Sequence, residues 1–320
     1  MTTEYKNSQS WQVEARRVAH GIRRRVLELT LERNGGYLSQ ACSAAEIIAT
    51  LYTRVLNIGP SLAPRIPPPL TGVPSKEFHH LMITGAKYNG PKEPNLDRFL
   101  LSPAHYAIVI YAALVETGRM DPEGLAQLNV EGSTAEMIGA EYSPGIELTT
   151  GSLGQGLSQA CGIAMARRLR GETGRVVMFM SDGELEEGQT WEAIQALAFF
   201  KMDNVIVYVD VNGQQVDGLT KNVMNVEPIQ SKIDAFGARV VVVNGHSVDE
   251  LVSPATLSPC GKPLFVLAYT NPCEGISLLN ELEPGTFHLV RFTDDAEWER
   301  YRSYLQLMQR EGGGSSGNSA

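Results

Sequence analysis

Two segments of the chain place oxygen-bearing side chains where apolar runs end. Asp182 follows the run RVVMFM, and Asn212 lies just beyond the run NVIVYVD, thirty positions later. The carboxyl ends of successive parallel strands meet at one edge of a sheet, and a crossover with its helix takes about this length of chain. Carboxylate and amide oxygens suit Mg²⁺ or Ca²⁺ and leave positions for phosphate and water. We therefore expect Asp182 and Asn212 to share a divalent cation.

The residues beside these two favour an anionic ligand at the same place. Gly213 permits a sharp turn, so a backbone carbonyl in NGQ could become a further ligand. Gly183 removes a side chain where a phosphate would approach, and the helix expected after it would offer free N–H groups. An aspartate and a glycine after a strand are more often a simple turn, and that interpretation would hold if the segment stood alone.

The elements that must position these residues form an alternating pattern. Continuous apolar, β-rich runs alternate with helical segments, which predicts parallel strands joined by crossover helices. Strands that read as unbroken apolar runs are covered on both faces. The sequence thus predicts an α/β fold, a parallel sheet flanked by helices, with strands at 176–180, 204–210, 238–243 and 263–269.

Other segments are predicted from periodicity and composition. We expect helical structure from Trp11 to about Leu56, a proline-rich irregular loop at 57–76, a helix at 103–117, a short helix after 120–124 and a last helix at 294–310. The small, polar residues 311–320 cannot bury enough surface to order themselves, so a disordered tail is expected there. Residues 1–310 are expected to form one domain.

The composition of the chain limits the kinds of binding partner and the cellular setting that we expect. The 320 residues carry 27 basic and 36 acidic side chains, a formal charge of −9, which disfavours nucleic acid and an anionic membrane surface. No apolar run approaches the roughly eighteen residues of a membrane span, and the polar start does not read as a secretory signal. Four scattered cysteines fit reduced thiols in the cytoplasm, with buried packing preferred to a metal site.

The segments DGELEEGQTWEA and NVIVYVDVNGQQVDG resemble the thiamine diphosphate fingerprint of transketolases, which usually begins GDG. Ser181 stands in place of the first glycine. The resemblance implies the thiamine diphosphate-binding fold. It also implies that Asp182 and Asn212 ligate the metal with their side chains and Gln214 with its carbonyl. Gly183 and Glu184 are placed at the diphosphate, and Glu187 resembles a residue at a dimer contact rather than a catalytic acid.

Two further segments support the resemblance. LDRFLLSPAHYAIVIYAAL is similar to a transketolase segment in which the histidine, here His105, contacts the diphosphate. A structural histidine is the alternative interpretation. ELTTGSLGQGLSQACGIAMA matches a glycine-rich segment, which implies that Gly151, Ser152 and Leu153 lie against the cofactor. A dinucleotide loop is disfavoured because the glycine order is G-x-x-G-x-G and no strand leads into it.

Near the C-terminus, KPLFVLAYTNPCEGISLLNELEPGTFH resembles a family segment with a diphosphate-facing histidine, and His288 is the matching residue. The remaining histidines have plainer explanations: a turn or N-cap for His246, and surface or packing positions for His20, His79 and His80.

Two histidines of the family pattern are absent. GYLSQACSAAE, matching GHPG-x-x-x-SAAE, places Tyr37 where a substrate-contacting histidine is expected, and Met137 or Ile138 replaces another. A tyrosine with an ordinary pKa near 10 cannot shuttle protons at neutral pH, though it can form hydrogen bonds. Tyr37, His105 and His288 are accordingly the catalytic candidates, with the donor or acceptor chemistry altered.

The resemblance covers residues 11 to 290 but only the first third to half of a full-length transketolase, whose catalytic glutamate lies on a later pyrimidine-binding domain. It therefore implies an N-terminal subunit that pairs with a C-terminal subunit, as an α2β2 heterotetramer. Together they would transfer a two-carbon ketol or related acyl unit from a ketose-like donor to an aldehyde-like acceptor. A thiamine enzyme that decarboxylates a 2-oxo acid, and a catalytically silent or regulatory cofactor-binding subunit, remain alternatives.

Overall fold

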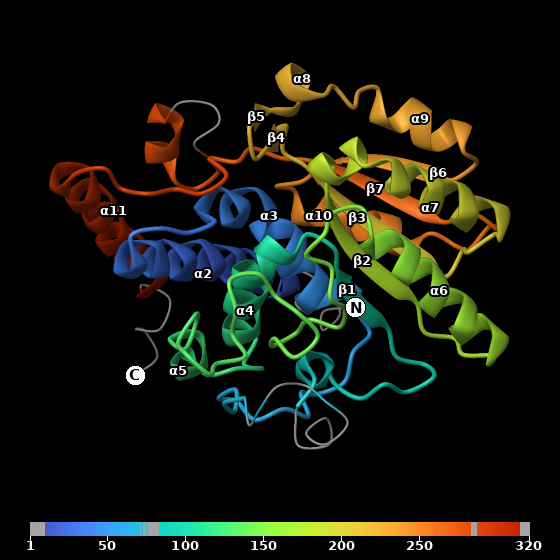
Figure 1. The fold of residues 1–320 in the computed structure, drawn as a ribbon, viewed down its shortest axis with the longest axis horizontal. Helices are drawn as coiled ribbons and strands as arrows, with labels where there is room; N and C mark the ends of the chain where they lie inside the picture. The colour runs from blue at the N-terminus through green and yellow to red at the C-terminus, as the bar shows by residue number, and fades with distance from the viewer. Residues whose placement is uncertain (1–9, 71, 73–74, 76–82, 283–286, 314–320) are drawn as a thin grey trace, which may run out of the picture.

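A five-stranded parallel sheet forms the centre of the molecule (Figure 1). The structure is a computed structural model that describes residues 10–70, 72, 75, 83–282 and 287–313. The strand order is β1-β2-β3-β7-β6 and every neighbouring pair is parallel. The strands are β1 Arg98–Leu101, β2 Val176–Ser181, β3 Val205–Val211, β6 Arg239–Asn244 and β7 Leu264–Tyr269. A small antiparallel pair, β4 Gln214–Gln215 and β5 Gly218–Leu219, follows β3.

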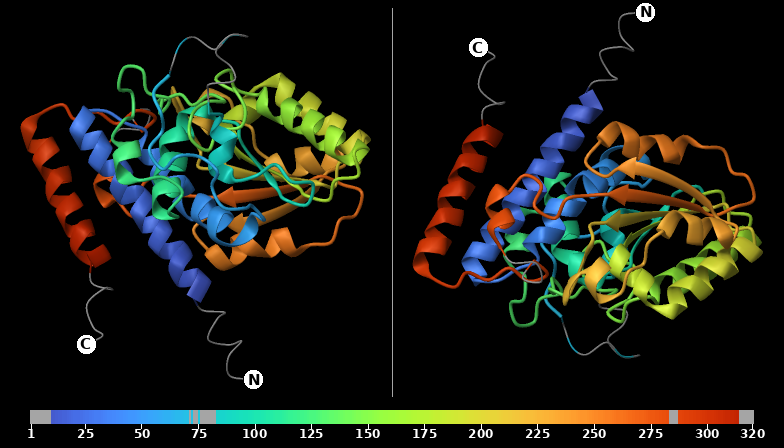
Figure 2. Two further views of the ribbon diagram at one scale, coloured as in Figure 1. Left: turned by 90° about the horizontal axis from the view of Figure 1, so that it is seen from below. Right: turned by 90° about the horizontal axis from the view of Figure 1, so that it is seen from above.

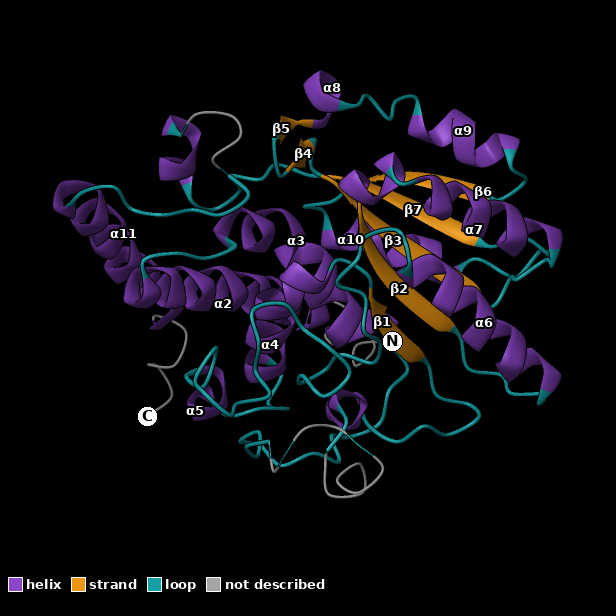
Figure 3. Ribbon diagram, viewed as in Figure 1, coloured by secondary structure: helices purple, strands orange, loops and turns teal. Residues whose placement is uncertain are grey.

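Helices cover both faces of this sheet (Figure 3). One face carries α2 Ser10–Arg33, α3 Leu38–Thr50 with its π-helical extension Leu51–Val55, α4 Ala107–Glu116 and α10 Val248–Val252. The other carries α6 Gly156–Leu169, α7 Gly188–Phe199 and α9 Ile229–Ala235. Short helices α5 Pro122–Leu125 and α8 Thr220–Val223 lie in connections. The last helix, α11 Asp295–Gly313, packs along α2 and is outermost on that side (Figure 2).

Alternate side chains of each strand enter different cores. Val177 and Phe179 of β2 pack with the α2, α3 and α4 layer, whereas Val176 and Met178 pack with the α6, α7 and α9 layer. All six residues of β2 and all seven of β3 are buried. This double burial is the physical reason that these strands read as continuous apolar runs, and it confirms the predicted parallel α/β sheet.

The predicted strands are confirmed to within about one residue at each end, but β1 of the five-stranded sheet and the short pair β4 and β5 were missed. β1 is only four residues long and runs directly into the loop before α4, so its apolar letters merge with the helical pattern that follows. The helical structure expected from 11 to about 56 is confirmed, and it is divided into two helices. The division between α2 and α3 lies where Asn34 adopts a positive φ of 48° ahead of Gly35 and Gly36.

The structure also bears on the predictions for the tail, the proline-rich segment and the remaining histidines. The disordered tail at 311–320 was wrong for its first three residues, because α11 continues through Gly313; residues 314–320 lie outside the described part. The described residues of the proline-rich segment 57–76 contain no helix or strand, as expected. His20 is a packing residue, with Nε2 3.1 Å from Met308 O, while His79 and His80 lie outside the described residues. Within the described chain, no helix has both the length and the apolar character to cross a bilayer.

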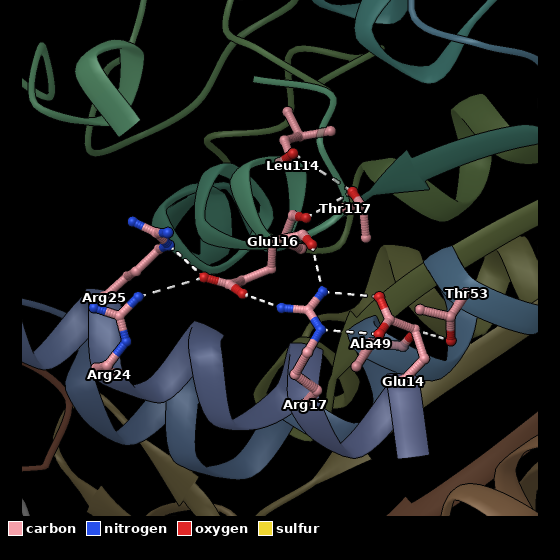
Figure 4. Close-up of polar contacts among 10 residues, drawn as sticks. Glu14, Arg17, Arg24, Arg25, Ala49, Thr53, Leu114, Glu116 and Thr117 are labelled. Atoms are coloured by element: carbon pink, nitrogen blue, oxygen red, sulfur yellow. Dashed lines mark hydrogen bonds and ion pairs between the residues drawn. The ribbon is translucent and has the colours of Figure 1, made fainter. Parts of the chain in front are cut away.

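One carboxylate clamps α2 to α4. Glu116, nearly buried at the end of α4, accepts hydrogen bonds from Arg17 at 2.7 Å and Arg25 at 2.5 Å, with Arg24 at 3.5 Å (Figure 4). Arg17 is held in turn by Glu14. Gly21 makes the clamp possible, because a Cβ at that position would lie 2.2 Å from the Glu116 carboxyl carbon.

A second ion network fixes α3 in place. Glu46 on α3 accepts from Arg23 of α2 at 2.5 Å and lies 2.9 Å from His246 Nδ1. His246 Nε2 accepts from the backbone N–H of Asn271, so its proton is on Nδ1 and points at Glu46. Burial opposes ionisation of Glu46, but the hydrogen bonds that it accepts from His246 and Arg23, together with the charge of Arg23, outweigh it and hold its pKa below the ordinary value. His246 lies in a turn, as expected, and also joins the loops after β6 and β7 to α3.

Candidate active site

A crevice opens at the carboxyl ends of four neighbouring strands of the sheet, where the loops that follow β1, β2, β3 and β7 meet. Its cavity has a volume of about 420 Å³. The loop after β1 contributes His105, the loop after β2 Gly183, the loop after β3 Asn212 and Gln214, and the loop after β7 Pro272. This is the edge at which ligands bind in open parallel sheets. The start of α3, the loop before α6 and the segment before α11 complete the wall with Tyr37, Gln40, Gly151, Leu153 and His288.

Three rings from distant parts of the sequence meet in this wall. The ring centroids of Tyr37 and His105 are 5.3 Å apart, those of Tyr37 and His288 5.4 Å, and those of His105 and His288 4.9 Å. An isolated bridge between Gly36 and Val290 sets this geometry by holding the two segments together through paired backbone hydrogen bonds of 3.1 and 3.0 Å. The structure thus brings together all three residues that the sequence predicts as catalytic.

The ring cluster is electrically neutral at physiological pH. Burial, with a smaller contribution from His288, lowers the pKa of His105 to about 3. Burial also lowers the pKa of His288, with Asp217 opposing it, and raises the pKa of the Tyr37 hydroxyl. Neutral imidazoles can both donate and accept hydrogen bonds, so this wall recognises oxygen atoms through hydrogen bonds and contributes no positive charge.

The two residues predicted to share a cation lie at the ends of adjacent strands. Asp182 Oδ2 accepts from Gly213 N at 2.9 Å, which ties the loop after β2 to the loop after β3. Asp182 Oδ1 is buried and has no hydrogen-bond partner among the described residues, and the same is true of Gln214 Oε1. Asn212 Oδ1 accepts from Gln214 N at 2.9 Å and keeps a second lone pair. Burial, reinforced by the charge of Asp210, raises the pKa of Asp182 well above its ordinary value.

Asp210, at the penultimate position of β3, is the functional neighbour that sequence reasoning missed. Its carboxylate is fully buried and accepts four hydrogen bonds, from Ser43 at 2.6 Å, Tyr106 at 3.0 Å, Thr270 at 2.5 Å and Asn212 Nδ2 at 3.2 Å. Burial raises its pKa although these four donors oppose the shift. The only available signal in the sequence is an acid inside an otherwise apolar strand, NVIVYVDV.

Glu184 and Gly183, the two residues after β2 that were predicted to lie at the diphosphate, have different surroundings in the structure. Glu184 is fully buried and points into the protein, where Oε1 accepts from Ser102 Oγ at 2.6 Å and Gly154 N at 3.2 Å. Its carboxylate therefore supports the loop before α6, and it is not among the residues that line the crevice. Gly183 does line the crevice, but a Cβ there would be 3.5 Å from the nearest atom, so packing within this chain does not require glycine.

The loop before α6 approaches the crevice with its backbone. Gly151 and Leu153 line the cavity, whereas the exposed Ser152 between them does not. Gly154 has a positive φ of 80°, and a Cβ at Gly156 would lie 2.3 Å from Ser102 Oγ. These two glycines let the loop turn and let α6 begin directly against the end of β1.

Comparison with known proteins places this architecture in a family. Residues 78–258 match the family described as "Transketolase, thiamine diphosphate binding domain". This chain belongs to the transketolase family. The transketolase resemblance of the sequence motifs is thereby confirmed.

Similar curated proteins of the transketolase family include short and long chains. A putative uncharacterized transketolase family protein of Sinorhizobium fredii is 34% identical, with 88% of this chain and 91% of the relative covered. A 6-deoxy-6-sulfo-D-fructose transketolase subunit of a Clostridium species is 31% identical (83% and 88% covered), as is an apulose-4-phosphate transketolase subunit of Actinobacillus succinogenes (89% and 94%). Human transketolase is 30% identical, but the match spans only 38% of its length.

Solved transketolases share the fold. The Campylobacter jejuni transketolase superposes with a TM-score of 0.68 at 21% identity and covers 94% of this chain, but the match spans 47% of that protein. The enzyme of Leishmania mexicana gives a TM-score of 0.67 at 21% identity. These neighbours show that the transketolase-type, thiamine diphosphate-binding fold is present.

The residues of this transketolase-family chain fit a bound divalent cation. Among the described residues, no group of three or more His, Cys, Asp or Glu side chains is arranged to hold a metal ion. The candidate donors are instead one carboxylate and amide or backbone oxygens, a set that Mg²⁺ and Ca²⁺ accept. The buried Asp182 Oδ1 has no hydrogen-bond partner in the described chain, so its lone pairs fit the role of a cation ligand.

Proposed function

We propose that this chain is the diphosphate-binding subunit of a two-chain transketolase that transfers a two-carbon ketol, or related acyl, unit from a ketose-like donor to an aldehyde-like acceptor. The observation that carries the proposal is the convergence of Tyr37, His105 and His288 with Asn212 and Gln214 around one crevice at the carboxyl edge of the sheet. Family membership supplies the reaction class.

The proposed cofactor site is built from three parts of the chain. Asp182 and Asn212 would hold Mg²⁺ or Ca²⁺ with their side chains and Gln214 with its carbonyl, and the cation would anchor a diphosphate. Thiamine diphosphate, when bound, supplies the nucleophilic carbon and the electron sink for ketol transfer. The backbone of Gly183 and of the loop Gly151–Leu153 would lie beside it, because these residues line or flank the crevice.

The ring cluster is proposed to handle the substrate. Tyr37, His105 and His288 can hydrogen-bond to carbonyl and hydroxyl oxygens, and each is neutral at pH 7. Ile138, at the place of a family histidine, lines the crevice with an apolar and exposed side chain. A substrate of this enzyme would therefore meet fewer hydrogen-bonding groups at that point than the family pattern provides.

A partner subunit is proposed to close the crevice. The two relatives named as transketolase subunits are covered over 88% and 94% of their lengths, whereas the human enzyme is covered over only 38%. The mouth of the crevice exposes Ile138, Val216 and Val223, apolar side chains that a partner would cover. We propose an α2β2 assembly in which the second chain brings the pyrimidine-binding domain. The four unpaired cysteines fit a reducing, cytoplasmic setting.

Mixing the chain with the product of a neighbouring gene that encodes a pyrimidine-binding domain tests the proposal. We expect ketol transfer that requires both chains, thiamine diphosphate and a divalent cation. Measuring carbon dioxide release in the same assay distinguishes decarboxylation of a 2-oxo acid. A mixture that neither binds the cofactor nor transfers a ketol unit would refute the proposal.

Tyr37 stands where the family pattern has a histidine, and this difference favours a second candidate function, a cofactor-binding subunit that is catalytically silent. Tyr37→His separates the two. Altered substrate preference in an active complex supports the transferase, whereas an active complex that tolerates Asp182→Ala would assign this chain a scaffold role.

A further inference from the structure

Gln40 lies in the first turn of α3 and forms part of the crevice wall with only 5% of its surface exposed. Its Nε2 is 3.1 Å from the backbone oxygen of His288 and 3.4 Å from His288 Nδ1. Its Oε1 is 3.1 Å from Ser39 Oγ. One buried amide therefore faces both the backbone and the ring of a candidate catalytic histidine.

These contacts fix which end of the amide faces His288. A backbone carbonyl oxygen can only accept a hydrogen bond, so the group beside His288 O must be the NH₂ of Gln40. The single hydroxyl hydrogen of Ser39 is directed at the backbone oxygen of Phe287, 2.6 Å away, so the longer contact of Ser39 Oγ with Gln40 Oε1 does not decide the orientation of the amide. Because the same NH₂ also faces Nδ1, that ring nitrogen must act as an acceptor and carry no proton.

We propose that Gln40 is a positioning residue that holds His288 in the tautomer with its proton on Nε2, so that this nitrogen donates into the crevice. Nε2 of His288 has no hydrogen-bond partner among the described residues, while His288 lines the cavity and its ring touches those of Tyr37 and His105. The hydrogen is thus available to an oxygen of a bound ligand. The second nitrogen of a histidine commonly sets its tautomer in this way.

Ser39 supports the same segment from the neighbouring position. Its hydroxyl donates to the backbone oxygen of Phe287 at 2.6 Å, so two consecutive side chains of α3 hold two consecutive carbonyls. The family pattern GHPG-x-x-x-SAAE has glycine at the position of Ser39 and no fixed residue at that of Gln40. The attachment is therefore not part of that family pattern, and it lies in the same turn as Tyr37, which stands where the pattern has histidine.

The catalytic meaning of the tautomer rests on the proposed function, but the tautomer itself does not. It can be measured in the full chain without partner or cofactor, so its failure and the failure of the proposed function are distinguishable. ¹⁵N-histidine-labelled protein is examined by NMR at pH 8, where the imidazoles are neutral, and the signals missing from His288→Phe identify His288. We expect protonated Nε2 and unprotonated Nδ1.

Two variants test the role of Gln40. In Gln40→Glu the carboxylate cannot donate, so we expect the proton of His288 to move to Nδ1. In Gln40→Leu, which keeps the volume and removes the donor, the population protonated on Nδ1 should rise by roughly fivefold, the weight of one ordinary hydrogen bond. If the Gln40→Glu variant does not fold, the Gln40→Leu variant alone tests whether Gln40 sets the tautomer of His288.

Ser39→Ala is the matched control. It removes the bond to Phe287 and leaves the Gln40 amide opposite His288, so the proton should stay on Nε2. Circular dichroism and thermal melting verify that each variant is folded. The proposal would be overturned if Nδ1 of His288 carried the proton in the native chain. It would also be overturned if a folded Gln40→Leu variant gave the same His288 spectrum as the native chain.

Discussion

Asp210 and Asn212 lie two residues apart at the end of β3, and the amide NH₂ of Asn212 donates to the Asp210 carboxylate at 3.2 Å. The same NH₂ donates to the Tyr106 hydroxyl at 3.0 Å. Both contacts require the nitrogen on that side, so they turn the amide oxygen of Asn212 toward Gln214. A buried acid that cannot itself reach the crevice thereby decides how a candidate metal ligand is presented.

Replacing Asp210 should therefore weaken both the fold and the cation site. Asp210→Leu removes the buried acceptor that four donors share, and we expect the free energy of unfolding to fall by roughly 3 kcal/mol, measured by urea denaturation. Cation affinity in the assembled complex should fall by about 10- to 100-fold, as for other residues that orient ligands. Asp234→Asn, at an exposed position of α9, should change neither quantity.

Asp182→Asn should abolish tight cation-dependent binding of thiamine diphosphate, with a loss greater than about 100-fold, because it removes the only carboxylate among the proposed ligands. Isothermal titration of the two-chain complex measures this. An unchanged affinity for thiamine diphosphate would show that Asp182 is not a ligand of the cation.

The substitution Gln214→Ala tests which oxygen of Gln214 ligates the cation. The substitution keeps the backbone carbonyl, so we expect less than about a threefold change in cation affinity if that atom is the ligand. A loss as large as that of Asp182→Asn would assign the ligand to the buried side-chain Oε1 instead.

The stability of the chain should depend on pH through His105. Its folded pKa of about 3 lies below the ordinary value near 6.5, so the unfolded chain binds the proton more readily. Stability is consequently lost as the pH falls from 6.5 toward 3, by up to tenfold in the unfolding equilibrium constant per pH unit. Urea midpoints of His105→Phe between pH 7 and 4.5 should fall less steeply than those of the native chain. Tyr37→Phe removes no group that titrates in this range and should retain the native slope.

Gly21→Ala should break the clamp between α2 and α4. The added methyl group would lie 2.2 Å from the Glu116 carboxyl carbon, and we expect a loss of about 1–3 kcal/mol in the free energy of unfolding. Gly162→Ala in α6 is the matched control, since a Cβ there meets nothing within 4 Å. It should stabilise the chain by roughly 0.5–1 kcal/mol. Equal effects of the two substitutions would contradict the role assigned to Gly21.

The sequence predicted the sheet and the ring cluster because both leave periodic or motif-like signals. Strands buried on two faces must be apolar throughout, and Asp182 and Asn212 stand out at their ends. The roles of Asp210, Ser39 and Gln40 could not be predicted, because each depends on a partner far away in the sequence: Asp210 on Ser43 and Thr270, Ser39 on Phe287, and Gln40 on His288. Glu184 was assigned to the diphosphate by its place in the motif, yet its carboxylate supports Ser102 and Gly154 inside the protein.

The crevice wall combines Tyr37, early in the sequence, with His288, far later in it. A ribosome that has made the Asp182 and Asn212 loops has thus produced the candidate cation ligands without the third ring of the wall. Fragments that stop short of residue 288 would carry the fingerprint motif and still lack one of the three rings of the crevice wall, so the candidate site is complete only after residue 288 has been made.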